Sequence, residues 1–168
     1  MIYRIRPVDA TSTRLAAVRR PVAWSELTAV LPRLFNEVYS FMATARVNQN
    51  GHNVCIYREC TDEGAELEVG VQVASSFVGN GQVMPSHSPA GRAIWTVHAG
   101  AYDGLPEAHQ AIEKWCETQH LAVANVRWEV YGDWNDDPRQ LHTDVFHLVA
   151  EGETAYPLPG AQERAEGV

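Results

Sequence analysis

Apolar and polar positions alternate along several stretches of the chain, and two of these stretches resemble each other. Residues 92–105 read RAIWTVHAGAYDGL, and residues 14–27, which lie 78 positions earlier, read RLAAVRRPVAWSEL. Both run from an arginine through apolar alternation to a Gly or Pro break, an aromatic residue, a polar residue that suits a helix N-terminus, and a leucine. Each stretch therefore predicts a strand that leads into a helix.

Two further pairs of stretches follow in the same order along the chain. EVGVQVA at residues 68–74 is similar to DVFHLVA at residues 144–150, and NVCIYRE at residues 53–59 is similar to RWEVYGD at residues 127–133. The offsets of these two pairs are 76 and 74 residues. An offset that drifts while the order is kept indicates an internal duplication with small changes in loop length.

The patterns predict an α+β domain of two pseudo-symmetric halves, each with the order strand, helix, strand, strand. Pro21 is expected to end the pairing of the second strand, and Pro32 to kink the first helix or delay its start to near Leu31. Asp103 is expected to cap the second helix. The predicted strands are residues 2–8, 14–20, 54–59, 67–73, 92–99, 126–131 and 143–149.

An antiparallel sheet with helices on one face leaves a cleft where two such halves meet, and a cleft of that kind suits a small molecule. We expect a single domain at residues 1–150, with halves at about 1–80 and 81–150. A flexible tail rich in Gly, Pro, Ala and Glu is expected at residues 151–168. The clear alternation at residues 67–73 predicts a half-buried strand.

Composition narrows the class of protein. A chain of 168 residues is long enough to bury a core without disulfides, and its three cysteines show neither an even number nor a metal-site spacing. Thirteen Lys and Arg against 21 Asp and Glu give a net charge of −8, which disfavours direct nucleic-acid binding. Because the sequence shows no membrane-length apolar run and no signal-peptide core, we expect a cytoplasmic protein.

Glu129 is the strongest candidate for chemistry, because it lies on a predicted internal strand. Alternation places it on the same face as Arg127 and Tyr131. A buried carboxylate either gains a partner, here Arg127, Arg92 or another arginine, or has a raised pKa. The second alternative gives a single acid in an aromatic pocket that binds a cation or moves a proton. If the protein is an enzyme, its catalytic candidates are Glu129 and Tyr131.

Aromatic residues on or beside the predicted strands are available to surround this acid, since each cation–π contact contributes about 0.5 to 2 kcal/mol. His98, which precedes the Gly100 turn, is either a proton carrier or a residue that bonds to neighbouring backbone. The candidate ligand-binding residues are Glu129, Tyr131, Trp95, Tyr57, Phe146, His98 and Tyr102.

The sequence contains no recognised metal, cofactor or nucleophile motif. His142 and His147 are five positions apart on one predicted strand and so face opposite ways, and His109 with Glu113 is only a two-ligand set on a predicted surface face. A phosphate-binding glycine loop and a nucleophile elbow are both missing from the sequence. We therefore expect no metal, no cofactor and no nucleophilic enzyme mechanism.

One combined motif is similar to that of a known family. HAGAYDGL at residues 98–105, Trp115 late in the next helix, WEVYGDW at residues 128–134, and then Asp137 and Pro138 resemble the GyrI-like small-molecule-binding domain. This domain also occurs as the effector-binding module of multidrug-responsive bacterial transcription activators. The resemblance covers most of residues 1–150.

The resemblance implies an SHS2-type duplication with a ligand cleft between the halves. It implies that Glu129 is a buried acid that meets lipophilic cations among stacked aromatic side chains. His98, Gly100 and Tyr102 match the motif of the strand-to-helix turn, and the resemblance implies that their role is mainly structural. Because no helix-turn-helix segment is found before the domain, we expect a stand-alone member of the family.

Three functions remain open. The first, which we favour, is a sensor or sequestering protein that binds hydrophobic, aromatic or cationic small molecules. The second is a hydrolase that opens electrophilic, cyclopropane-type rings of DNA-alkylating natural products in the same cleft. The third is a gyrase-modulating protein or another binder of a protein partner. The sequence offers no evident second acid, base or nucleophile, and this favours binding over catalysis.

Overall fold

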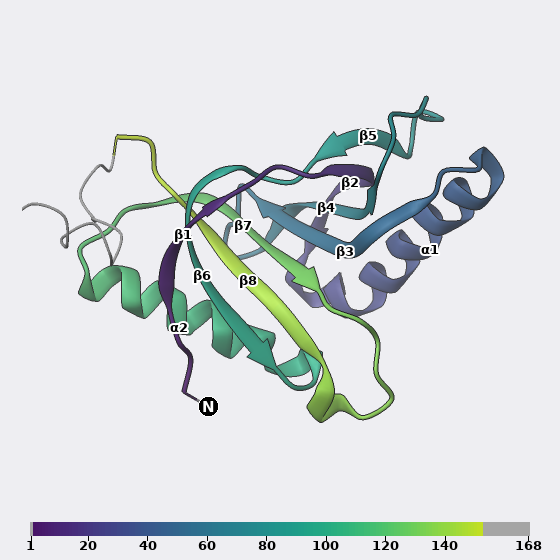
Figure 1. Cartoon of the computed structure of the whole chain (residues 1–168). Coiled ribbons are helices and arrows are strands. Elements are labelled where there is room, and N and C mark those ends of the chain that lie inside the picture. Colours follow the sequence, from purple (N-terminus) through teal and green to yellow (C-terminus); the bar gives the residue numbers. More distant parts are fainter. Residues whose placement is uncertain (1, 153–168) are drawn as a thin grey trace, which may run out of the picture.

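Eight strands of the computed structural model, which describes residues 2–152, form one antiparallel sheet, and two helices lie on one side of it (Figure 1). The α+β class predicted from the sequence is confirmed. Within the described part of the chain, neither helix is long and apolar enough to cross a membrane. The elements are β1 (Arg6–Ala10), β2 (Arg14–Ala23), η1 (Trp24–Glu26), α1 (Leu27–Ala45), β3 (Gln49–Arg58), β4 (Gly64–Val73), β5 (Met84–His87), β6 (Gly91–Ala99), η2 (Tyr102–Gly104), α2 (Leu105–Thr118), β7 (Val123–Tyr131), η3 (Pro138–Gln140) and β8 (His142–Val149).

The sheet has a pseudo-twofold symmetry about its centre. Its strand order is β1-β6-β8-β7-β3-β4-β2-β5, with β3 and β7 paired in the middle. From the centre outward, β7, β8 and β6 of the second half correspond to β3, β4 and β2 of the first. The outermost strands are exchanged, because β1 pairs with β6 and β5 pairs with β2. Each half thus contributes its first strand to the edge of the other, and the halves form one interlocked sheet.

The two helices cover the outer parts of the same sheet face. α1 packs on β2 and β4, whereas α2 packs on β6 and β8. The buried residues of each helix recur every three or four positions, as an amphipathic helix on a sheet requires. They are Leu34, Val38 and Met42 in α1, and Leu105, Ala108, His109, Ile112 and Cys116 in α2. The side chains of the central strands β3 and β7 on this face therefore point between the helices.

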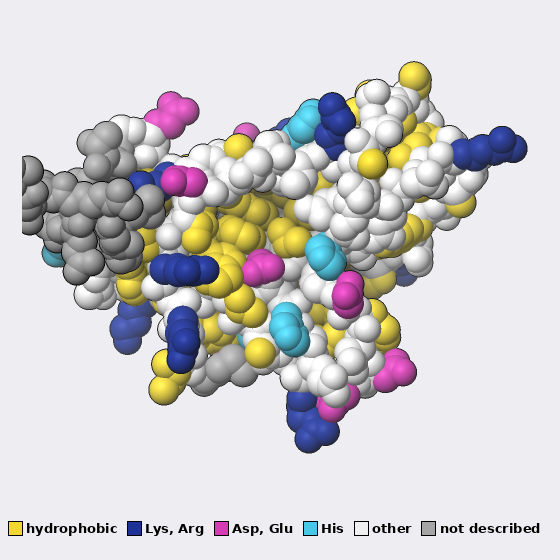
Figure 2. Space-filling view, in the orientation of Figure 1, with side chains coloured by type: hydrophobic (Ala, Val, Ile, Leu, Met, Phe, Trp, Pro, Cys, Tyr) yellow, Lys and Arg dark blue, Asp and Glu magenta, His cyan; other side chains and the backbone are white. Residues whose placement is uncertain are grey.

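The face without helices carries a second apolar cluster. Figure 2 shows hydrophobic side chains gathered over the centre of this face. The rings of Trp128 and Phe146 stack there in parallel, with centroids 4.8 Å apart. β4 is consequently buried on both faces, and the prediction of a half-buried strand is wrong. Even Glu68 is only 4% exposed, and its carboxylate accepts hydrogen bonds from Arg58 and Ser86.

Several predicted boundaries are wrong where tertiary pairing overrides the local pattern. β1 begins at Arg6 rather than Ile2. β2 continues through Pro21, because β5 pairs with β2 only opposite residues 14–17 and the strand is an edge at Pro21, where a missing N–H is tolerated. The segment between β4 and β6 contains the short strand β5, which was not predicted because the segment is rich in proline and serine.

The helix starts also differ from the prediction. α1 begins at Leu27 and contains Pro32, so the delayed start near Leu31 is wrong, whereas the alternative of a kink stays a prediction. α2 has no side-chain cap, because Asp103 lies within the preceding 3₁₀ turn η2 instead of at the N-cap. The predicted tail falls mostly on residues 153–168, which lie outside the described residues.

Candidate ligand-binding site

The space between the two helices is an open cleft of about 1110 Å³. Its floor is formed by side chains of β3 and β7, and its walls by the facing sides of the helices and of the turns that precede them. The α1 wall is largely apolar and includes Trp24, Leu27, Leu31, Pro32 and Phe35. The α2 wall is more polar and includes Tyr102, His109, Gln110 and Glu113. The titratable groups of the cleft are therefore concentrated on the side of the second half.

Glu129 lies in the floor of the cleft and is 2% exposed. Its Oε2 atom accepts hydrogen bonds from the hydroxyl groups of Tyr57 and Tyr131, at 3.0 and 2.6 Å. Its Oε1 atom accepts a hydrogen bond from Nε2 of His109 at 2.9 Å. A carboxylate has about four acceptor positions. Among the residues that the structure describes, these three donors leave one position on Oε1 for a ligand.

Of the two alternatives that the sequence left for Glu129, a charge partner or a raised pKa, the structure shows a partner, which is His109. Burial raises the pKa of this carboxyl, but the hydrogen bonds and charge of His109 and the hydrogen bonds of Tyr131 and Tyr57 outweigh it, so that the pKa is lowered. Glu129 is therefore a carboxylate at neutral pH. A buried acid with a raised pKa, the other alternative, is wrong, because the pairing partners were not visible in the local pattern.

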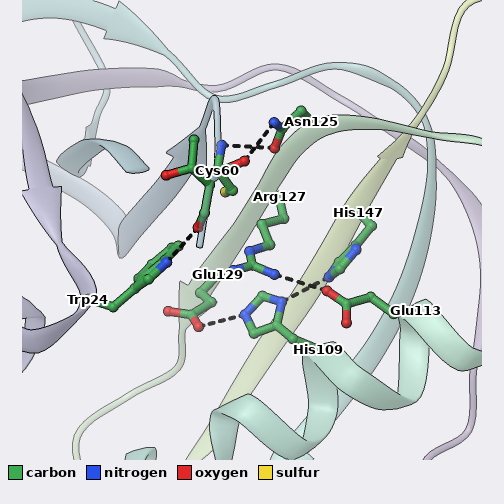
Figure 3. A network of polar contacts seen from close by, with 9 residues as sticks. Trp24, Cys60, His109, Glu113, Asn125, Arg127, Glu129 and His147 are labelled. Atoms are coloured by element: carbon green, nitrogen blue, oxygen red, sulfur yellow. Dashed lines mark hydrogen bonds and ion pairs between the residues drawn. The ribbon is translucent and has the colours of Figure 1, made fainter. Parts of the chain in front are cut away.

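A second histidine lies behind His109 (Figure 3). Nδ1 of His109 and Nε2 of His147 are 2.9 Å apart, and both rings are buried. Burial, and then the positive charges of His109 and Arg127, lower the pKa of His147 from 6.5 to about 3. His147 is thus neutral near pH 7. The chain Glu129, His109, His147 runs from the cleft into the interior between α2 and β8.

The prediction that His109 lies on a surface face is wrong. His109 is 8% exposed, because it shares the buried side of α2 with Leu105, Ala108 and Ile112. The helical spacing of apolar residues already indicated a buried His109, because it directly follows the core residue Ala108 and lies three residues before the core residue Ile112. His147 was assigned correctly to the face opposite His142, but only the tertiary contact reveals its partner.

Arg127 does not neutralise Glu129, although both face the cleft. Its Nη1 atom donates a hydrogen bond to Glu113 of α2 at 3.0 Å. Its guanidinium carbon lies 5.4 Å from the ring centroid of Trp24 and 5.8 Å from that of Tyr57. The arginine is thus held at one end of the cleft by an acid and two aromatic rings, and the partner that the sequence proposed for Glu129 is replaced by His109.

Aromatic rings continue from the acid towards the mouth of the cleft. The ring of Tyr131 meets those of Phe35 and Tyr102 edge to face, at centroid distances of 6.0 and 5.3 Å. Tyr102 in turn contacts Trp134, a cleft residue that is 72% exposed. Asp133, beside Trp134, also lines the mouth. The entrance therefore combines aromatic surface with negative charge.

The structure brings four of the predicted site residues together, namely Glu129, Tyr131, Tyr57 and Tyr102. It does not place Trp95 and Phe146 with them, and this placement is corrected: both lie on the helix-free face, where they line a separate hollow of about 280 Å³. Trp95 donates a hydrogen bond to Asp144 there. Neighbours on a strand face opposite ways, and because Ile94 precedes Trp95 and Val145 precedes Phe146, the apolar pattern does not show which of the two faces the cleft.

His98 also lies outside the cleft. It is 3% exposed, its Nδ1 atom is 2.9 Å from the Tyr3 hydroxyl, and its Nε2 atom is 2.8 Å from the Ala101 carbonyl oxygen. The Nε2 contact holds the strand-to-helix turn, and the Nδ1 contact links His98 to the segment before β1. The predicted placement of His98 in the ligand site is therefore corrected. In the described part of the chain, no group of three or more His, Cys, Asp or Glu side chains is arranged to hold a metal ion.

Comparison with known proteins identifies the fold through solved structures. No family model and no curated protein matches the sequence. The structure matches that of the C-terminal domain of EcmrR with a TM-score of 0.75 over 89% of this chain and 99% of that domain, at 20% identity. The predicted resemblance to GyrI-like effector-binding domains is thereby confirmed at the level of the fold.

Two other solved structures share this fold. SAV2435, solved bound to tetraphenylphosphonium, matches with a TM-score of 0.63 and 12% identity over 90% of this chain and 95% of its own. A hydrolase from Listeria innocua matches with a TM-score of 0.56 and 10% identity over 88% of this chain and 92% of its own. The fold is thus common to a protein solved with a bound lipophilic cation and to a hydrolase.

Proposed function

We propose that the protein binds aromatic, lipophilic cations in the cleft between α1 and α2, as a sensor or sequestering protein. The observation that carries the proposal is the ionised, buried carboxylate of Glu129, which faces an aromatic cleft of about 1110 Å³ with one acceptor position open. A buried charge is costly unless it is balanced. The three hydrogen bonds to Glu129 stabilise its charge, and a cation in the cleft is attracted to the same charge at short range.

The surroundings of Glu129 favour a flat or aromatic cation over a small hydrated ion. Tyr57 and Tyr131 present rings in the floor of the cleft, and Tyr102 presents its ring on the α2 wall. Leu31 and Phe35 present apolar surface on the α1 wall. A cation over an aromatic face gains about 0.5–2 kcal/mol per ring, and more when water is excluded. The related fold of SAV2435, which was solved with tetraphenylphosphonium, supports the same ligand class.

The second candidate function is hydrolysis of an electrophilic ring in this cleft. Its supporting observation is the open acceptor position on Oε1 of Glu129, which is suited to orient a water molecule. Two features weigh against it as the first choice. The lowered pKa makes Glu129 a weak base, and both nitrogens of His109 are already engaged. The structure adds His109 as a second titratable group, but not one that faces a substrate with a free nitrogen.

The test compares two probes of nearly equal shape and opposite charge, tetraphenylphosphonium and tetraphenylborate. In the wild type, the phosphonium should bind with a defined stoichiometry, as measured by titration calorimetry at neutral pH. Glu129→Gln keeps an acceptor for the tyrosines but removes the charge, and should weaken the phosphonium by about tenfold or more, equivalent to about 1.4 kcal/mol. The borate should bind poorly to the wild type and no worse to the variant.

Asp133→Asn is the matched control, because it removes the same charge from an exposed carboxylate at the mouth. It should change the phosphonium affinity about twofold or less, since exposed charges are screened. Equal affinity of the wild type and Glu129→Gln for the phosphonium would contradict the proposed function. Steady loss of an electrophilic test compound in the wild type alone, followed by mass spectrometry, would establish the hydrolase instead.

A further inference from the structure

We propose that His109 decides which ligand charge the cleft accepts, because a bound cation displaces a proton from this histidine, whereas an uncharged aromatic ligand binds with His109 protonated. The inference rests on the proposed binding function and adds that cation binding is coupled to the release of one proton. His109 then acts as a specificity-determining residue, and His147 as the residue that positions it.

The hydrogen bonds around His109 allow only two arrangements. Glu129 is an acceptor, so Nε2 of His109 carries a hydrogen in both of them. The 2.9 Å contact between Nδ1 of His109 and Nε2 of His147 holds a single hydrogen. If that hydrogen belongs to His147, His109 is neutral. If it belongs to His109, that ring is an imidazolium and His147 accepts with its own hydrogen on Nδ1. The two states differ by one proton.

The charge of the buried cluster follows from these states. With His109 neutral, the cluster carries the single negative charge of Glu129. With His109 as imidazolium, the charges cancel. A ligand cation beside Glu129 would then face a second positive charge whose Nε2 lies 2.9 Å from the same carboxylate. Like charges at such range disfavour each other strongly in a buried site. The cation and the proton therefore compete for one carboxylate.

The other groups that face His109 do not supply an alternative counter-charge. From β3, Tyr57 meets the imidazole edge to face at 6.1 Å, and Cys55 is a buried thiol whose pKa is raised by burial and then by Glu129. From β7, Arg127 is paired with Glu113 of α2, the same helix that carries His109. From β8, His147 is held neutral by burial. Glu129 is thus the negative charge that stabilises both the extra proton on His109 and a cationic ligand.

Linkage between the two ligands sets the measurable effect. If cation binding expels one proton, the affinity for the cation rises by up to tenfold per pH unit while His109 is protonated in the free protein, and becomes constant at higher pH. By the same linkage, an uncharged ligand leaves the proton in place, so its affinity stays nearly constant with pH.

The experiment is titration calorimetry of the full chain with tetraphenylphosphonium from about pH 5.5 to pH 8.5, a range that spans histidine titration, in two buffers with different ionisation enthalpies. The difference between the buffers counts the protons released. Triphenylphosphine oxide serves as the uncharged probe. The wild type should release up to one proton per phosphonium at the acidic end and none at the alkaline end, and should release none on binding the oxide.

His109→Gln is the decisive variant, because its amide N–H still reaches Glu129 but does not titrate. It should bind the phosphonium with a flat pH profile and without proton release. His147→Gln tests the positioning role and should move the pH midpoint of the wild-type profile, as observed also by nitrogen NMR of the imidazole rings. A structural role alone would leave that midpoint in place.

The outcomes separate this inference from the proposed function. Phosphonium binding that depends on Glu129 but shows no proton release at any pH would overturn the inference and leave the binding function intact. Absence of phosphonium binding at every pH would overturn both. If His109→Gln does not fold, the proton count of the wild type alone decides, because it needs no variant.

Discussion

Leu34→Ala is expected to lower the free energy of unfolding by about 2–5 kcal/mol. Leu34 is 2% exposed and packs from α1 into the core between this helix and the sheet. Removal of the Cγ, Cδ1 and Cδ2 carbons there leaves a cavity that the packed neighbours fill only in part. Leu31, one turn earlier on the same helix, lines the cleft instead. Leu31→Ala removes the same atoms from a solvent-accessible wall, and should cost about 1 kcal/mol or less.

Urea denaturation followed by circular dichroism gives both values, and titration with tetraphenylphosphonium gives the complementary effect. Leu31→Ala should weaken ligand binding by removing apolar contact area from the cleft wall, whereas folded Leu34→Ala should bind nearly as the wild type does. Equal losses of stability in the two variants would show that the cleft closes over Leu31. That result would contradict the open cleft on which the proposed function rests.

The fold was largely predictable because its strands follow alternation and because the duplication repeats them. The strand-turn-helix unit recurs as β2, η1, α1 and as β6, η2, α2, with Trp24 and Tyr102 at equivalent positions. Three features depended on pairing over long distances in the chain and were not predictable. They are the strand β5, the exchange of β1 and β5 between the halves, and the passage of β2 through Pro21.

The part of the candidate site that lies on the single strand β7 was predictable from the sequence. Alternation along β7 placed Arg127, Glu129 and Tyr131 on one face, as observed. It did not give the sign of the pKa shift, because that sign depends on donors from β3 and α2. It also failed for Trp95 and Phe146, since strands with apolar side chains on both faces give no clue to which face holds the cleft.

Comparison of the two halves explains why the chemistry lies in one of them. Equivalent positions of the two halves form the same scaffold but differ in residue type around Glu129. Leu31, Cys55 and Val71 of the first half are equivalent to His109, Glu129 and His147 of the second. Of the four pairs compared around Glu129, Tyr57 and Tyr131 have the same residue type, and both hydroxyls donate to the same oxygen of Glu129. The symmetric fold therefore supplies two tyrosines and a cleft, and three apolar-to-polar differences supply a charged chain on one side of it.

Acidification should destabilise the protein through His147, and this is the second large effect. The pKa of His147 is lowered from 6.5 to about 3 by burial and then by the charges of His109 and Arg127. Between these values the unfolded state binds a proton on His147 that the folded state does not. Stability is therefore complete above pH 6.5 and falls with decreasing pH, by up to about 1.4 kcal/mol per pH unit, or about 3 kcal/mol by pH 4.5.

His147→Gln has no such proton to gain, so its unfolding free energy should fall much less steeply between pH 6.5 and 4.5, as measured by urea denaturation at each pH. His142→Gln, on the same strand but exposed, should keep the wild-type slope. Glu129 acts in a different window, because its lowered pKa gives stability that is lost only below its ordinary value of 4.5. A wild-type slope in His147→Gln would mean that another group takes up the proton, and the buried histidine pair would then not control the charge of the cleft.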